Sequence, residues 1–216
     1  MLELGLKTLI AYLLGSLVGA LLIGRLRGVD IRTLGSGNAG GTNALRTQGL
    51  AFAVATVVID VGKGWLAAGW LPGFAIPGVA PDPALARDWL AVSCAAAAVT
   101  GHVWPLWHEF RGGKGGATLA GSLLALSPTL LAIALGAWLA VVAVSGFVGL
   151  ATVSAAAATV IATGWPPVAS PAMLVFTLAM SALVAWAHRV NFARIRAGEE
   201  PRATRLWLFR PRGPTR

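Results

Sequence analysis

Hydrophobic residues in this chain form long runs, and the first three runs are close to the length of a membrane-spanning helix. They cover residues 4–23, 50–71 and 89–107. A helix needs ~20 consecutive apolar residues to cross the hydrocarbon core of a bilayer. The pattern therefore predicts three transmembrane helices in the first half of the chain, separated by a polar segment over 24–49 and a Pro/Gly-rich segment over 72–88.

The second half of the chain contains one apolar stretch, residues 117–187, with three predicted helix breaks. The breaks fall where serine, glycine and proline interrupt the run, at Ser127-Pro128, Ser145-Gly146 and Gly164–Pro167. They divide the stretch into four helices, of which the first, 117–126, is too short to span a bilayer alone. We expect an all-α, polytopic helical bundle with seven transmembrane helices, and five is the alternative count.

Composition favours the same class of protein. Hydrophobic residues make up 56% and charged residues 12% of the 216 positions, and the mean hydropathy is +0.74. Soluble domains are about 25% charged. We expect one transmembrane domain over 1–216, with a basic tail at about 189–216. The first apolar run is followed by Arg25 and Arg27 rather than by a cleavage site, which predicts a retained helix and not a signal peptide.

Positive charge is concentrated in three polar segments, 24–49, 108–116 and the tail, whereas 72–88 is nearly neutral. The bias of arginine and lysine toward the cytoplasm predicts an N-terminus outside and a C-terminus in the cytoplasm. The polar motifs would then share the cytoplasmic face of the cytoplasmic membrane. The formal charge of +9 does not indicate nucleic-acid binding, because the arginines flank membrane segments and no soluble fold presents them.

The segment Glu109–Leu119 carries one lysine, Lys114, among four glycines. Glycine allows successive backbone N–H groups to converge on one point, as in phosphate-binding loops. A helix that begins near Thr118 would add its free N–H groups and its positive dipole end. The segment therefore predicts a site for a phosphate or another small anion at the membrane surface.

Two further polar stretches are predicted to lie at the same face. Asp30–Arg46 is rich in glycine and asparagine, as a solvated linker would be. However, its two ends look like a helix cap at Asp30 and a helix start near Thr42. The other stretch is His188–Glu200. It places three polar residues at a spacing of three, so they share one face of a helix: His188, Asn191 and Arg194.

Together these stretches resemble the PlsY family, the bacterial glycerol-3-phosphate acyltransferases that use acyl phosphate, over essentially the whole chain. The matching residues are Gly35-Ser36-Gly37-Asn38, Thr42-Asn43, Arg46, Asp60-Val61-Gly62-Lys63-Gly64, Gly101-His102, Pro105, Phe110-Arg111-Gly112-Gly113-Lys114-Gly115, Ala117-Thr118, His188, Asn191, Arg194 and Gly198-Glu199. Two positions depart from the family pattern. Arg111 stands where lysine is expected, and Gly149 stands where serine is expected, so Ser145 or Thr152 could supply a hydroxyl instead.

The resemblance implies that a fatty acyl phosphate gives its acyl group to the 1-hydroxyl of sn-glycerol 3-phosphate. The products are lysophosphatidic acid and inorganic phosphate, in the first acylation step of phospholipid synthesis at the bacterial inner membrane. An acyl phosphate has a good leaving group, so no covalent nucleophile is required, and positioning and oxyanion donors would carry the reaction. The expected partners are the two substrates and membrane lipids. No cofactor, metal, nucleic acid or obligate protein partner is expected.

The resemblance also implies roles for individual residues. Catalytic roles are expected for Ser36, Asn38, Lys114, His188 and Asn191. Substrate binding is expected for Gly37, Gly40, Thr42, Asn43, Arg46, His102, Gly112, Gly113, Gly115, Gly116, Thr118, Arg194 and Glu199. His188 is one candidate for the base; alternatively, the substrate's own phosphate takes the proton and His188 organises Asn191. His102 also suits a structural hydrogen bond, and Asp60 with Lys63 suits a structural ion pair within a span.

The alternative function is a membrane transporter of a phosphorylated anion, since transporters also use broken helices and glycine-rich loops. Transporters usually place such sites at the midplane and repeat them in two halves. Here the polar motifs are predicted near one face, and the sequence shows no internal repeat. The pattern therefore favours the acyltransferase.

Overall fold

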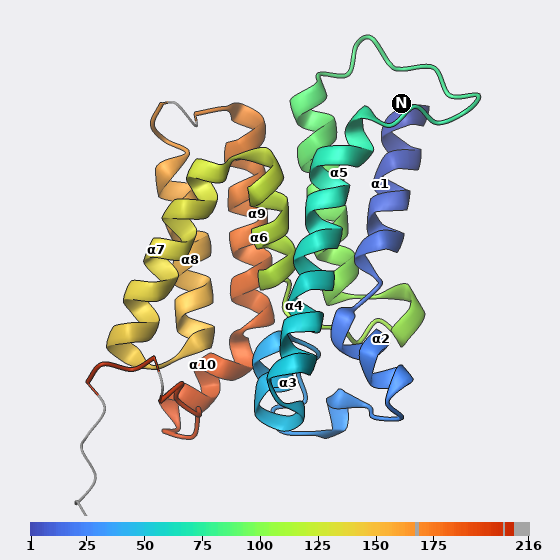
Figure 1. The fold of residues 1–216 in the computed structure, drawn as a ribbon. Helices are drawn as coiled ribbons and strands as arrows, with labels where there is room; N and C mark the ends of the chain where they lie inside the picture. Colours follow the sequence, from blue (N-terminus) through green and yellow to red (C-terminus); the bar gives the residue numbers. More distant parts are fainter. Residues whose placement is uncertain (167–168, 205, 210–216) are drawn as a thin grey trace, which may run out of the picture.

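The computed structural model describes residues 1–166, 169–204 and 206–209, and these contain helices and connecting segments but no strand (Figure 1). Pro167 of the third predicted break and residues 210–216 of the predicted tail lie outside the described residues. The α-helices are α1 (Leu2–Gly15), α2 (Gly19–Leu26), α3 (Gly41–Gln48), α4 (Leu50–Trp65), α5 (Arg87–Val103), α6 (Gly116–Leu126), α7 (Pro128–Ser145), α8 (Val148–Ala162), α9 (Pro171–Ala187) and α10 (Arg189–Arg196). The predicted all-α fold is confirmed.

The division of the second apolar stretch into four helices is also confirmed. Ser127 caps α7 with its side chain, and Pro128 follows in the first turn, where a missing N–H costs nothing. Gly146 ends α7 with a φ of 75°, a left-handed conformation that glycine adopts without strain. The third break follows Ala162, the last residue of α8.

Three segments are long and apolar enough to cross a membrane by themselves: Leu50–Gly73, Arg87–His108 and Pro128–Ser145. Two bent helix pairs, α1 with α2 and α9 with α10, bring the number to five if each pair forms one span. Helices α6 and α8 are apolar but shorter. The structure is thus a multi-pass helical bundle, and the count of seven crossings stays a prediction.

The first apolar run, predicted as one span over 4–23, is not a single continuous helix. It forms α1 and α2, whose axes differ by 48°, with a break between Gly15 and Gly19. The reason lies in α4. The Asp60 carboxylate accepts a hydrogen bond from the Gly19 N–H (3.0 Å), and the Lys63 ammonium donates to the Leu17 carbonyl (3.0 Å). Backbone groups that are freed inside a membrane need such partners.

Helices α4 and α6 are in close contact because a glycine on each helix faces the backbone of the other helix. A methyl group added at Gly64 would lie 2.1 Å from the Thr118 carbonyl oxygen, and one added at Gly121 would lie 1.9 Å from that of Val61. Small residues let membrane helices approach until their backbones touch. This contact fixes the start of α6, and with it the end of the glycine–lysine segment, relative to α4.

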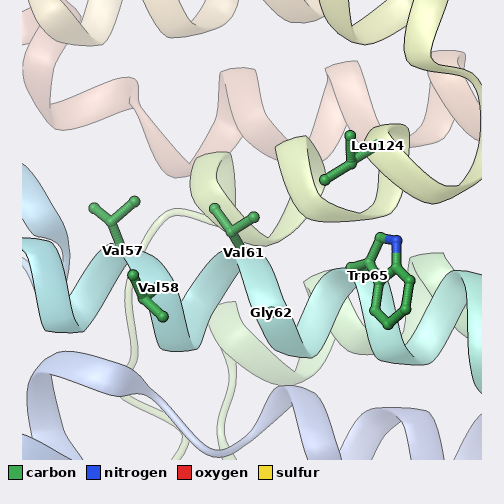
Figure 2. Close-up of a pocket in the computed structure, with 6 residues that line it drawn as sticks. All are labelled: Val57, Val58, Val61, Gly62, Trp65 and Leu124. Carbon is green, nitrogen blue, oxygen red and sulfur yellow. The ribbon is translucent and has the colours of Figure 1, made fainter.

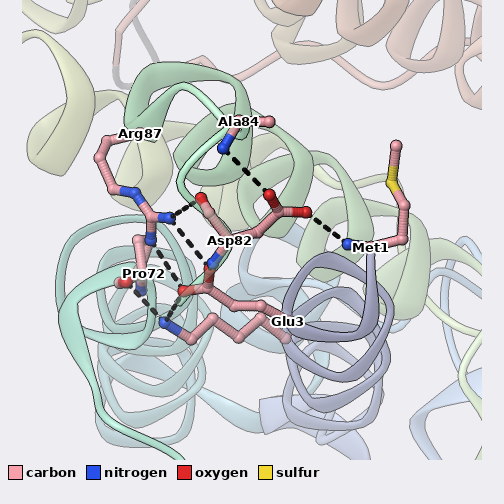
Figure 3. Close-up of polar contacts among 7 residues, drawn as sticks. Met1, Glu3, Pro72, Asp82, Ala84 and Arg87 are labelled. Carbon is pink, nitrogen blue, oxygen red and sulfur yellow. Dashed lines mark hydrogen bonds and ion pairs between the residues drawn. The ribbon is translucent and has the colours of Figure 1, made fainter. Parts of the chain in front are cut away.

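The two ends of the bundle carry different polar structures. At one end, where the N-terminus and the 72–88 segment lie, ion pairs link α1 to the start of α5 (Figures 1 and 3). Glu3 accepts two hydrogen bonds from Arg87 (2.8 and 2.9 Å) and one from Lys7 (2.9 Å). Lys7 also donates to the Pro72 carbonyl (2.7 Å). The opposite end holds α2, α3 and α10, and the three predicted motifs are found there.

Candidate active site

Side-chain contacts bring the three polar stretches together at one end of the bundle. The Lys114 ammonium donates to the Asn191 side-chain oxygen, which joins the glycine–lysine segment to α10. The Asn191 amide nitrogen donates to Glu200 (2.7 Å), and the Arg46 guanidinium donates to the Pro201 carbonyl (3.1 Å). Residues that are separated by more than 150 positions in the sequence therefore border one site.

Lys114 lies at the centre of this site and is only partly accessible to solvent. Burial lowers the pKa of its ammonium to about 8. The carboxylate of Glu200 acts in the opposite direction, whereas the positive charges of Arg194 and Arg46 lower the pKa further. Two arginines thus lie close enough to Lys114 to act on its charge, and one carboxylate partly balances the three cations. Such a site is suited to a phosphate.

Asn191 is buried between α10 and α8. A methyl group added at Gly149 would lie 3.0 Å from both Cβ and Cγ of Asn191, so the absence of a side chain at Gly149 leaves room for the asparagine. The two hydroxyls that could replace a serine are used locally. Ser145 donates to Val141 (2.6 Å), and Thr152 accepts from the indole N–H of Trp138 (3.2 Å) and donates to a carbonyl of its own helix.

The 30–46 segment is an ordered loop rather than a flexible linker. Asp30 caps a short 3₁₀ turn by accepting from the Arg32 N–H (2.9 Å), as predicted. Asn43 is buried, and its amide accepts from the Ser36 N–H (3.0 Å) and donates to the Leu34 carbonyl (2.9 Å). Asn43 therefore fixes the backbone of the loop, and with it the position of Ser36.

The glycine–lysine segment differs from the predicted convergence of N–H groups. The N–H groups of Gly112 and Gly113 donate back to the carbonyls of Val103 (3.2 Å) and His102 (3.1 Å) at the end of α5. They are committed to the fold, so they do not face an anion. Gly115 has a φ of 83° and leads directly into α6 at Gly116, two residues before the predicted start. Within this segment, any backbone N–H group that contributes to anion binding therefore lies at residue 114 or later.

The two histidines of the prediction have different surroundings. His188 is buried at the 50° bend between α9 and α10, and its Nδ1 lies 2.8 Å from the Val184 carbonyl. A carbonyl only accepts, so Nδ1 carries the proton and Nε2 of the neutral ring can accept another. His102 instead lies within the bundle, where its Nδ1 is 2.8 Å from the Lys63 ammonium. This geometry supports the structural interpretation of His102.

The remaining predicted residues are spread around the loops. Asn38 lies over Gly40, since a methyl group at Gly40 would meet its amide nitrogen at 2.8 Å. Thr118 is fully buried, and its hydroxyl has no hydrogen-bond partner within the described ranges. Four predicted residues are solvent-exposed: Gly37, Thr42, Arg46 and Glu199.

Sequence reasoning missed Glu200. It selected Glu199, but the structure places the adjacent carboxylate in the site, where one oxygen accepts from Asn191 and the other is buried without a hydrogen-bond partner among the described residues. Glu199 and Glu200 are adjacent residues of the same type, so the sequence alone does not show which of them enters the site. Only the turn after α10, in which the Glu199 N–H returns to the Arg194 carbonyl (2.8 Å), determines which one points inward.

An apolar groove of about 370 Å³ lies between α4 and α6 (Figure 2). Its lining residues are Val57, Val58, Val61, Gly62, Trp65 and Leu124. At one end it adjoins α3, because a methyl group at Gly41 would lie 2.7 Å from the side chain of Val57. The groove therefore reaches α3, the helix that carries Arg46.

The fold and the site define a multi-pass helical membrane protein with a partly buried cationic site at one end. A sequence profile described as glycerol-3-phosphate acyltransferase matches residues 6–198. The chain is 43% identical over 209 residues to the glycerol-3-phosphate acyltransferase of Thermosynechococcus vestitus, covering 92% of this chain and 94% of that protein. A Pseudomonas aeruginosa enzyme of the same name is 39% identical, covering 90% and 97%. This chain belongs to the glycerol-3-phosphate acyltransferase family.

Solved structures agree with this assignment. The crystal structure of PlsY, an integral membrane glycerol 3-phosphate acyltransferase, in its glycerol 3-phosphate form superposes with a TM-score of 0.80 at 29% identity, covering 96% of this chain and 99% of that chain. Its lysophosphatidic acid form gives a TM-score of 0.78 at 30% identity, covering 92% and 94%. The resemblance predicted from the sequence is confirmed at the level of family and fold.

Proposed function

We propose that this chain transfers the acyl group of a fatty acyl phosphate to the 1-hydroxyl of sn-glycerol 3-phosphate and releases lysophosphatidic acid and inorganic phosphate. Family membership supports the acyltransferase activity and the acceptor. The observation that supports phosphate-bearing substrates is the cluster of Lys114, Arg46 and Arg194, in which three cations lie beside one carboxylate, that of Glu200. Acyl phosphate and glycerol 3-phosphate each bring a phosphate to the site.

In this reaction the 1-hydroxyl oxygen attacks the acyl carbonyl carbon, and the bond from that carbon to the phosphate oxygen breaks. Lys114 neutralises phosphate charge, and Ser36 and Asn38 donate to the developing oxyanion. The hydroxyl proton passes to a phosphate oxygen of the substrate, and Nε2 of His188 is the second candidate acceptor. Asn191 aligns Lys114, because it is hydrogen-bonded to Lys114 on one side and to Glu200 on the other.

We further propose one membrane domain with seven crossings, an N-terminus outside and a C-terminus in the cytoplasm. The site would face the cytoplasm of the bacterial inner membrane and would work without an obligate protein partner. The excess of arginine at the site end supports this orientation. In a Cys94→Ala background, a cysteine at Gly198 should react with an impermeant thiol reagent only from the cytoplasmic side, and a cysteine at Gly78 only from outside. The reverse labelling would overturn the orientation.

The donor is tested with purified protein in detergent, given palmitoyl phosphate or palmitoyl-CoA with glycerol 3-phosphate. Released phosphate and lysophosphatidic acid are measured together. We expect one phosphate per lysolipid with palmitoyl phosphate and no lysolipid with palmitoyl-CoA. Equal turnover with the two donors would exclude the acyl phosphate assignment and leave acyl transfer intact. The transporter alternative is tested with the same protein reconstituted into lipid vesicles. Uptake of glycerol 3-phosphate into the vesicles, with no lysophosphatidic acid formed, would indicate the transporter.

A further inference from the structure

Three ionisable side chains form a buried cluster in the interior of the bundle, apart from the cationic site. Asp60 and Lys63 in α4 and His102 in α5 are 1%, 4% and 3% exposed. The Lys63 ammonium lies 2.9 Å from the Asp60 carboxylate and 2.8 Å from Nδ1 of His102. Ionisable groups at such depth are costly and usually carry a function.

On one side the cluster binds the backbone at the α1–α2 break. Asp60 accepts from the Gly19 N–H and Lys63 donates to the Leu17 carbonyl, each at 3.0 Å. These bonds satisfy groups that a broken helix leaves without intrahelical partners. The cluster therefore fixes the broken helix pair against α4.

On the other side the cluster reaches the glycine–lysine segment. The His102 carbonyl accepts from the Gly113 N–H (3.1 Å), and a methyl group at Gly113 would lie 2.2 Å from Nε2 of His102 and 2.8 Å from the Ala39 carbonyl oxygen. Gly113 is thus enclosed between the imidazole and the loop that carries Ser36. The next residue in the chain is Lys114.

The protonation of His102 follows from its neighbour. Nδ1 of His102 faces the Lys63 ammonium at 2.8 Å and the Asp60 carboxylate at 3.4 Å. The ammonium is the nearer partner and has donors only, so Nδ1 of the neutral ring accepts from it and the ring proton is on Nε2, on the side of Gly113. Lys63 thereby sets the tautomer and the orientation of the ring against which the glycine–lysine segment packs. In α4, Gly64 follows Lys63 directly and packs against the backbone of Thr118 at the start of α6.

We propose that Asp60, Lys63 and His102 are positioning residues that set the place of Lys114 in the phosphate site. They do not touch substrate; they act through Gly113. The proposal rests on the function proposed above, because it assigns them an effect on glycerol 3-phosphate and acyl transfer. A purely structural cluster would change stability alone.

The opposite end of the bundle offers a matched control. Lys7 is 3% exposed, bonds to a carboxylate one turn away, Glu3, at 2.9 Å, and donates to a backbone carbonyl, that of Pro72, at 2.7 Å. Lys63 has the same three features. Lys63→Met and Lys7→Met therefore remove equivalent groups, one beside the proposed site and one far from it.

The experiment measures Tm and kcat/KM for glycerol 3-phosphate in both variants, well below their Tm values. We expect both to lose thermal stability, but only Lys63→Met to lose kcat/KM, by about ten-fold or more, since small displacements of a catalytic group are costly. If Lys63→Met does not fold, His102→Gln, which leaves the ion pair in place, serves instead. Equal kcat/KM in the Lys63 and Lys7 variants would overturn the proposal.

A double-mutant cycle provides the second readout. If Lys63 acts through Lys114, Lys63→Met should add little to the loss caused by Lys114→Ala, because coupled residues are not additive. Independent, multiplying losses would contradict the proposal. The wild-type protein is run in the same assay: if it has no turnover with palmitoyl phosphate, the proposed function fails, whatever the variants show.

Discussion

The two ends of the bundle use charge in opposite ways. At the N-terminal end, Glu3 pairs with both Arg87 and Lys7, and the N-terminal ammonium pairs with Asp82, so each of these charges has an ion-pair partner. At the other end, the charges of Arg46 and Arg194 lower the pKa of Lys114, and the Glu200 carboxylate acts in the opposite direction. Charges that are all held in ion pairs stabilise a fold, whereas three cations beside one carboxylate leave charge that a bound phosphate can neutralise.

This difference determines what substitutions should do. A change at the N-terminal end should alter the folded fraction, because no bound phosphate depends on it. A change at the cationic end should alter turnover, because Lys114 and its neighbours supply charge that the fold itself does not need.

Lys114→Ala should cause the largest loss of activity. It removes a charge-assisted contact to phosphate in a partly desolvated site, which corresponds to a loss of ~2–4 kcal/mol of transition-state stabilisation. Steady-state kcat/KM with palmitoyl phosphate and glycerol 3-phosphate measures it. The control is Arg87→Ala at the other end, which should lower Tm and leave kcat/KM per folded protein nearly unchanged. Similar kcat/KM losses in both variants would erase the distinction between the ends.

Asn191→Ala should cut kcat more than it raises the KM for glycerol 3-phosphate. Asn191 joins Lys114 to Glu200, so its loss leaves a lysine without its oriented acceptor in the transition state. Removing one such positioned polar group costs about 100-fold in kcat in well-studied enzymes. Initial rates over a range of both substrates separate kcat from KM. A pure KM effect would place Asn191 in ground-state binding instead.

Arg46→Ala should weaken turnover by about ten-fold or more, as expected for a lost charge-assisted phosphate contact. Arg46→Lys should restore only part of this activity, because a lysine lacks the planar fork that binds two oxygens. Steady-state kcat/KM of both variants tests this prediction. Full rescue by lysine would show that charge alone is needed at this position.

The pH profile should show the smallest effect. Burial lowers the pKa of Lys114 to about 8, so the ammonium of the empty site is charged below that pH and loses its charge as the pH rises through it. We expect kcat/KM for glycerol 3-phosphate to fall above about pH 8. The phosphate of the substrate is already fully ionised there, since its second pKa is about 6. Lys114→Arg should remove this decline, and a decline that persists would assign it to another group.

Sequence reasoning predicted the features that depend on neighbours in the chain and missed those that depend on distant ones. The breaks at Ser127-Pro128 and Gly146 are local and were predicted. The break between Gly15 and Gly19 was missed, although Gly15-Ser16 is a local signal of the same kind as Ser145-Gly146. The groups that stabilise this break, Asp60 and Lys63, lie in α4. Long-range partners of this kind are not visible in a hydrophobic pattern.

The candidate site shows the same division. Lys114, Arg46 and Asn191 could be predicted by type and spacing, and the structure brings them together. The N–H groups of Gly112 and Gly113 were predicted to face an anion, yet they bond to the end of α5, since the turn after Val103 decides their direction. Glu199 was chosen over Glu200 for a related reason, because the turn after α10 decides which carboxylate points inward.

The central claim is that Lys114 lies in a site that binds phosphate. Isothermal titration of purified protein with sn-glycerol 3-phosphate, compared with glycerol, tests it most directly, in the wild type and in Lys114→Met. We predict saturable binding of glycerol 3-phosphate and none of glycerol in the wild type, and a loss of about 30-fold or more in affinity in a folded Lys114→Met protein. Unchanged affinity in the variant would contradict the phosphate site.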